Sequence, residues 1–101
     1  MNKRFSLVFH PLAEREYLDS VVWYEESLTG LGSRFVREIE SALNTIEKNP
    51  FAFQIKKLNF REAVVKHFPF VIVYRINAKK KEVYVLSVFH TSRNPQEKIR
   101  K

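Results

Sequence analysis

The sequence predicts an α+β fold in which an N-terminal helical hairpin packs on a small antiparallel sheet, in the order β-α-α-β-β-β. Three observations predict it. Apolar residues recur at helical spacing through residues 11–48, the apolar runs become short and β-branched after Pro50, and both glycines, Gly30 and Gly32, lie between the two helical stretches. We expect one domain over residues 1–101, because a chain of 101 residues supports a single core.

The first two elements are predicted to be a strand and a long helix. The apolar run from Phe5 to Phe9 is typical of a strand. Pro11 marks a helix start, because the first turn does not need its missing N–H. The apolar stripe that this helix would bury consists of Tyr17, Val21, Tyr24 and Leu28, widened by Leu18 and Val22.

A second helix is expected from about Ser33. Its apolar row is Phe35, Ile39, Ala42 and Ile46, flanked by Val36 and Leu43. Asn49-Pro50 ends it, since the residue before a proline avoids helical geometry. Two long helices joined by the short break at residues 29–32 predict an antiparallel helical hairpin.

The rest of the chain is predicted to form strands followed by a C-terminal tail. Residues 53–58 are a weak strand candidate and residues 60–68 a better one. Residues 70–76 are almost entirely apolar and predict a strand that is buried on both faces. Residues 77–81, with the lysines of Lys79–Lys81, form a hairpin loop before a last strand at 82–90, and residues 91–101 form a basic C-terminal tail.

Composition excludes several classes of site. The chain has no cysteine, which removes disulfides, thiolate zinc sites and a cysteine nucleophile. His10, His67 and His90 lie far apart, so we expect no metal and no cofactor. No apolar run approaches the ~20 residues of a membrane helix, and we expect a cytoplasmic protein.

Charge is distributed unevenly along the chain. Residues 1–50 hold six Lys and Arg against eight Asp and Glu, whereas residues 51–101 hold twelve against three. A basic half indicates a polyanion or an acidic protein as partner. The alternative is that the basic residues form a surface that only confers solubility. We expect the carboxylates of the helices to face solvent.

Basic and aromatic residues alternate in the second half and supply the candidate functional residues. Phosphate contact or target binding is assigned to Arg61, Arg75, His90 and Arg93, with a secondary basic surface at Lys56, Lys57 and Lys66. His90 could accept a 2′-hydroxyl proton while an arginine holds the phosphate charge, which would cleave RNA without a metal. The alternative is structural: Phe60, Phe68, Phe89 and Tyr74 pack in the core, and Arg75 pairs with a helix carboxylate.

Two segments carry a family resemblance. Residues 68–76, Phe-Pro-Phe-Val-Ile-Val-Tyr-Arg-Ile, and residues 85–95, which end His90-Thr91-Ser92-Arg93-Asn94-Pro95, occur in the order derived above. With the opening His10-Pro11 and the Gly30–Phe35 helix start, the chain resembles the RelE/ParE superfamily of type II toxins, within it the ParE-like, plasmid-stabilisation branch. The resemblance implies a RelE/ParE-like fold and a toxin that a cognate antitoxin neutralises.

The resemblance also implies two alternative targets. RelE-like members cleave mRNA on the ribosome, and ParE-like members inhibit DNA gyrase without hydrolysis by the toxin. The strand arginine of the RelE-like enzymes corresponds here to Val71, their paired lysines to Glu62 and Val64, and His90 is followed by Thr91 rather than tyrosine. The segment from His90 to Pro95 favours the ParE-like form. The resemblance therefore favours a protein that is not an enzyme, and it identifies no catalytic residues.

Three functional hypotheses follow. The first is a gyrase-inhibiting toxin, the second a ribosome-dependent, metal-independent mRNA endonuclease, and the third a decayed toxin that only binds its antitoxin. The basic half predicts an acidic antitoxin segment. Apolar grooves beside the helical hairpin would anchor that segment, in a toxin–antitoxin hetero-oligomer.

Overall fold

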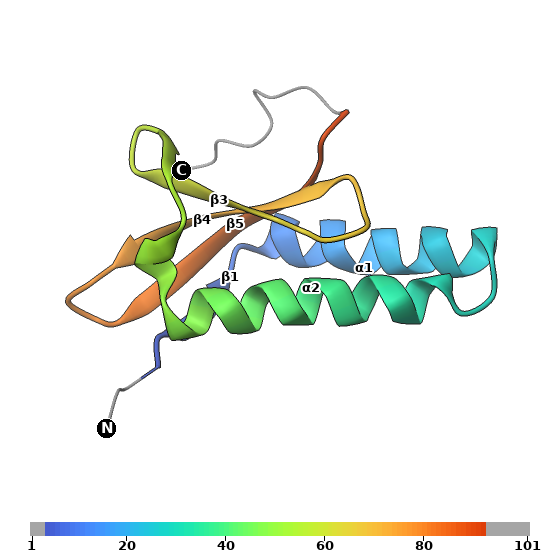
Figure 1. Cartoon of the computed structure of the whole chain (residues 1–101), viewed down its shortest axis with the longest axis horizontal. Coiled ribbons are helices and arrows are strands. Elements are labelled where there is room, and N and C mark those ends of the chain that lie inside the picture. The colour runs from blue at the N-terminus through green and yellow to red at the C-terminus, as the bar shows by residue number, and fades with distance from the viewer. Residues whose placement is uncertain (1–3, 93–101) are drawn as a thin grey trace.

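A computed structural model describes residues 4–92 of the chain. The elements, in order, are β1 (Ser6–Phe9), α1 (Pro11–Ser27), α2 (Leu31–Lys48), the short 3-10 helix η1 (Pro50–Ala52), β2 (Ile55–Lys57), β3 (Phe60–Val64), β4 (Phe70–Asn77) and β5 (Glu82–His90). The two helices lie side by side along one face of the sheet (Figure 1). The predicted α+β fold and its helical hairpin are therefore confirmed.

The sheet differs from the expectation in two details. Its strand order is β1-β5-β4-β3-β2, and β1 runs parallel to β5, so the sheet is mixed rather than purely antiparallel. The weak candidate at residues 53–58 forms the three-residue strand β2 at the far edge. A parallel neighbour is possible for β1 because the whole helical hairpin lies between it and the other strands in sequence.

The helix termini follow local signals. The Nδ1 atom of His10 accepts a hydrogen bond from Leu12 N at 3.0 Å, which caps α1, with Pro11 as its first residue. Gly30 has φ = 91°, a left-handed conformation that glycine adopts without strain, and α2 starts directly after it. Neither helix within residues 4–92 is long and apolar enough to cross a membrane.

The core lies between the helices and the sheet. It is built on α2, which buries Phe35, Ile39, Leu43 and Ile46, and on the inward residues of β4 and β5. A second buried cluster lies on the opposite face of the sheet and comprises Phe60, Val71, Val73, Leu86 and Phe89. The expectation that β4 is buried on both faces is thus confirmed.

The predicted stripe of α1 is only partly correct. Tyr17, Val21 and Tyr24 pack against the core. Leu18 and Val22 are 57% and 55% exposed and Leu28 is 63% exposed. Helix α1 therefore carries apolar residues on a face that no described element covers.

Candidate functional site

Arg61 is partly buried and is bonded to the backbone next to β3. Its Nη1 atom donates hydrogen bonds to the carbonyl oxygens of Phe51 and Phe53, and its guanidinium lies 5.5 Å from the centre of the Phe51 ring. These contacts fasten η1 and the segment after it to β3. Both hydrogen bonds use Nη1, so a contact of Arg61 with a target would use its Nε and Nη2 groups.

Arg75 lies on the face of the sheet away from the helices. Its side chain is exposed, and its guanidinium lies 5.4 Å from the centre of the Tyr84 ring rather than beside a helix carboxylate. It lines a surface groove of about 550 Å³ with Val8, Asn59, Ile76, Asn77, Ala78, Lys79, Glu82 and Tyr84. This groove is the most direct structural support for a target-binding role of Arg75.

His90 lies at the opposite end of the same hairpin. Arg75 pairs with Tyr84, whereas Phe70 pairs with His90. The five-residue separation between Phe70 and Arg75 corresponds to about 17 Å along a strand. His90 also points to the helix side, where its ring meets Phe70 edge-on at 5.1 Å. Arg75 and His90 therefore do not form one site.

A β-bulge decides which way His90 points. Val73 pairs with Ser87 but Tyr74 pairs with Val85, so Leu86 is the extra residue in β5. Before the bulge Val83 and Val85 face the helices, and after it Val88 does so. Without this shift of one residue, His90 would lie on the other face of the sheet.

A carboxylate of α1 fixes β5 just after the bulge. The Oε1 atom of Glu16 accepts hydrogen bonds from Ser87 Oγ at 2.9 Å and from Val88 N at 3.1 Å. Glu16 therefore holds α1 to β5 close to His90, and it was not recognised from the sequence as more than a solvated carboxylate.

The ring nitrogens of His90 have distinct surroundings. Its Nδ1 accepts a hydrogen bond from Ser92 N at 3.2 Å and lies 2.7 Å from Ser92 Oγ. Since a backbone N–H donates to Nδ1, the proton of the neutral ring lies on Nε2. His90 can then donate a hydrogen bond from Nε2.

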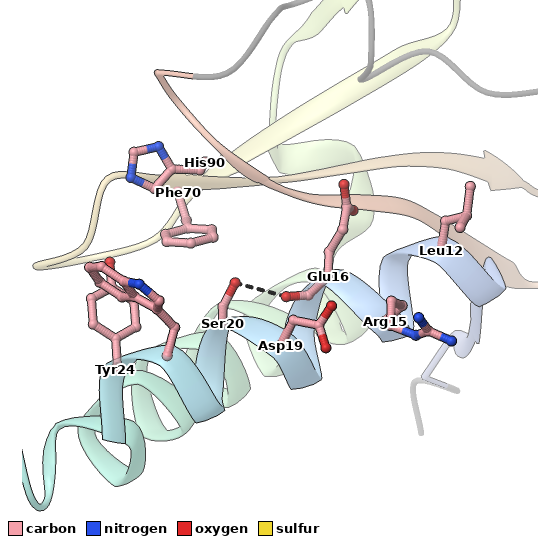
Figure 2. Close-up of a pocket in the computed structure, with 9 residues that line it drawn as sticks. Leu12, Arg15, Glu16, Asp19, Ser20, Tyr24, Phe70 and His90 are labelled. Carbon is pink, nitrogen blue, oxygen red and sulfur yellow. Dashed lines mark hydrogen bonds between the residues drawn. The ribbon is translucent and has the colours of Figure 1, made fainter. Parts of the chain in front are cut away.

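Between α1 and the ends of β4 and β5 lies a cavity of about 590 Å³ (Figure 2). We call it the α1 cavity. Its lining residues are Leu12, Arg15, Glu16, Asp19, Ser20, Trp23, Tyr24, Phe70 and His90. Of these, only His90 had been singled out as functional. The sequence did indicate that this face of α1 is unusual, because α1 carries apolar side chains, such as Leu12 and Trp23, outside its predicted buried stripe.

The secondary basic residues lie elsewhere. Lys56 and Lys57 are exposed on β2, at the edge of the sheet opposite β1. Lys66 lines a small groove beside α2 with Glu38 and Thr45. Arg93 falls outside the described residues. Among residues 4–92 no group of three His, Cys, Asp or Glu side chains could hold a metal ion.

The position that the RelE-like enzymes use for a strand arginine is apolar in this fold. Val71 is 7% exposed and packs in the cluster formed with Phe60, Val73, Leu86 and Phe89. The centre of this sheet face therefore presents no cation at that position, and the described candidates, Arg61, Arg75 and His90, lie in three separate places.

Comparisons with solved structures support the same fold. The chain superposes on a protein of the chromosomal ParDE system from P. aeruginosa with a TM-score of 0.74 and 16% identity, covering 87% of this chain and 97% of that one. The E. coli RelE toxin gives a TM-score of 0.67 at 19% identity, covering 91% and 89%. A chain of the toxin–antitoxin complex RelBE2 from Mycobacterium tuberculosis gives 0.61 at 15% identity, covering 87% and 99%.

Comparison with curated proteins gave no significant match. The family model described as the ParE toxin of the type II toxin–antitoxin system parDE matches residues 7–95, which is nearly the whole chain and includes every described strand and helix except the first residue of β1. With the RelE/ParE fold established independently by the superpositions, the chain belongs to the ParE toxin family of type II toxin–antitoxin systems.

Proposed function

We propose that this type II toxin acts by binding and inhibiting DNA gyrase, and that a cognate antitoxin neutralises it in the cytoplasm. The observation that carries the gyrase proposal is the separation of the candidate residues. General acid–base cleavage of RNA needs a proton-transfer group and a phosphate-holding cation within reach of one substrate. Among residues 4–92, His90 and Arg75 lie at opposite ends of the β4–β5 hairpin and on opposite faces.

Gyrase inhibition is tested by DNA supercoiling with purified gyrase and an excess of the folded toxin. We expect supercoiling to be inhibited, and Arg75→Ala to weaken the inhibition if the Arg75 groove contacts the target. Arg37→Ala is the matched control, because it removes an exposed arginine from α2 that has no hydrogen bond or ion pair with residues 4–92. Unimpaired supercoiling at a large excess of toxin would refute the proposal.

An mRNA endonuclease is the second candidate. It is favoured by the structural likeness to the E. coli RelE toxin and by His90, whose Nε2–H beside the cavity could protonate a leaving group as a general acid rather than accept the 2′-hydroxyl proton. Mapping mRNA 5′ ends soon after induction tests it. New ends at a fixed place within codons, dependent on translation, would support it, and unaltered cell killing by the double variant His90→Ala, Arg93→Ala would exclude it.

Neutralisation is tested by growth. Induction of the toxin alone should arrest growth, and co-expression of the protein encoded beside it should restore growth. The proposal draws on the origin of two structural relatives, a ParDE system and a RelBE2 toxin–antitoxin complex. No growth effect on induction would instead favour a decayed toxin that only binds its antitoxin.

A further inference from the structure

The α1 cavity combines aromatic surface with carboxylates. Trp23, Tyr24 and Phe70 contribute rings, and the Trp23 and Tyr24 rings meet edge-on at 5.1 Å. Glu16 and Asp19 contribute the carboxylates. Trp23 is 63% exposed and Leu12 is 52% exposed, so a large apolar area at the rim faces solvent. Burial of such area is the main source of affinity in protein recognition.

The acidic residues of α1 favour a positively charged ligand in the α1 cavity. Helix α1 carries Glu14, Glu16, Asp19, Glu25 and Glu26 against the single cation Arg15. Glu16 already holds Ser87 and Val88, whereas Asp19 has no hydrogen bond or ion pair with any residue of the described range 4–92. A carboxylate beside aromatic faces attracts a cation by ion pairing and by cation–π contact.

The other occupants fit this surface less well. A nucleic acid would bring phosphates against Glu16 and Asp19 in the cavity and against the further carboxylates of α1 around it. A second copy of this chain docked through the same face would bring two acidic helices together, since a symmetric interface uses the same patch twice. Arg15 lies toward the Leu12 end of the cavity, with Asp19 between it and Tyr24 (Figure 2).

We propose that the α1 cavity receives an arginine or lysine side chain from an apolar segment of the antitoxin, with Asp19 pairing its charge and Trp23 covering its alkyl stem. This inference rests on the proposed neutralisation by an antitoxin. It adds a cationic contact on α1 to the acidic segment that the basic half of the chain attracts. The antitoxin would then contact both a carboxylate on α1 and the cations of the basic half of the toxin.

Trp23 provides a direct readout because it is the only tryptophan in the chain. The probes are three short peptides, acetyl-Leu-X-Leu-amide, with arginine, norleucine or glutamate at X. The indole N–H resonance of Trp23 is followed during titration of the folded toxin. We expect the arginine peptide to bind about tenfold more tightly than the norleucine peptide, as for a charge-assisted hydrogen bond.

Two toxin variants separate a local contact from the general charge of the helix. Asp19→Asn should remove most of the preference for arginine. Glu26→Gln is the matched control, because it removes one exposed carboxylate from the same helix but does not line the cavity. Equal binding of the arginine and norleucine peptides, tighter binding of the glutamate peptide, no binding by any peptide, or equal effects of the two variants would each overturn the proposal.

The cognate complex supplies the link to the antitoxin. Antitoxin binding should move the Trp23 indole resonance, and Asp19→Asn should weaken the complex more than Glu26→Gln. An unmoved resonance in a formed complex would show that the antitoxin does not use this cavity. The peptide titration involves neither gyrase nor growth, so its failure is distinct from a failure of the proposed function.

Discussion

Tyr74 illustrates how a residue in the basic and aromatic half of the chain serves the fold. Its side chain is fully buried, and its hydroxyl donates a hydrogen bond to Pro50 O at 2.6 Å. Arg61 pairs with Tyr74 across the sheet and donates to the carbonyls of Phe51 and Phe53. Together they donate hydrogen bonds to three carbonyl groups in and just after η1, those of Pro50, Phe51 and Phe53.

Tyr74→Phe should destabilise the protein by about 1–3 kcal/mol, because the Pro50 carbonyl would lose its buried donor. Urea unfolding measures the effect. Tyr84→Phe is the control, since Tyr84 is only half-buried and its hydroxyl has no hydrogen bond with residues 4–92. Equal losses in the two variants would show that the bond to Pro50 contributes little.

The same hydroxyl predicts a loss of stability at high pH. Burial raises the pKa of Tyr74 to about 12, although the nearby Arg61 charge lowers it in part. In the unfolded chain the Tyr74 hydroxyl has the ordinary tyrosine pKa of 10.0. The stabilisation by Tyr74 is therefore complete below about pH 10 and is lost as pH rises toward 12. The stability difference between wild type and Tyr74→Phe should therefore narrow over this window. A difference in unfolding free energy that does not change with pH would contradict this role of the Tyr74 hydroxyl. The ionisation of Tyr17 and Tyr24 contributes equally to both proteins and cancels in the difference.

At the scale of elements, the helical hairpin depends on a close approach at its turn. Gly32 N donates to Glu25 Oε1 at 3.0 Å, and Gly30 N donates to Glu25 Oε2 at 2.9 Å. Farther along, Tyr17 donates to Glu40 Oε2 at 3.1 Å, and burial followed by the Glu40 charge raises the pKa of Tyr17. These contacts set the register between α1 and α2.

Gly32→Ala should destabilise the hairpin even though alanine favours helices. A Cβ at this position would lie 2.9 Å from Val21 O and from Glu25 Cβ, so the two helices would have to move apart. We expect a loss of about 1–3 kcal/mol in urea unfolding, as for other overpacked sites. Ser33→Ala, one residue on and exposed, should be close to neutral. A stabilising effect of Gly32→Ala would contradict the close approach.

At the scale of the whole molecule, charge is divided between two surfaces. Helix α1 carries five acidic residues and one basic residue, whereas residues 55–81 carry eight basic residues and one acidic residue. The sequence led us to expect the acidic antitoxin segment in apolar grooves beside the hairpin. The structure places the exposed apolar residues of α1 on the acidic side. The basic segment carries exposed apolar residues as well, among them Ile55, Leu58 and Val64. An acidic antitoxin segment would therefore find both cations and apolar anchors there.

Association with an acidic antitoxin segment should accordingly depend on salt. We expect the association rate to fall as ionic strength rises, because salt screens exposed charges beyond about 10 Å at 0.1 M. Replacing Lys79, Lys80 and Lys81 together by alanine should lower the rate at low salt and flatten its salt dependence. Stopped-flow mixing measures both. A rate that does not change with salt would remove the electrostatic part of the antitoxin proposal.

Local signals in the sequence were sufficient for most of the elements. Pro11, the Gly30–Gly32 break and Asn49-Pro50 act through backbone sterics within a few residues, so helix boundaries could be predicted from them. The apolar run of β4 predicted a strand buried on both faces. The burial of Phe60, Phe89 and Tyr74 followed from their type.

By itself the sequence determined the fold class, the helical hairpin and the uneven charge, because each depends on residues near one another in the chain. Only the tertiary structure decided the parallel pairing of β1, the hydrogen bonds from Arg61 to the backbone carbonyls around η1, the bulge at Leu86 and the α1 cavity. These features join residues that are far apart in the chain, such as the paired Ser6 and Glu82. Their geometry depends on how the packed layers meet, since a one-residue shift in β5 turns His90 from one face of the sheet to the other.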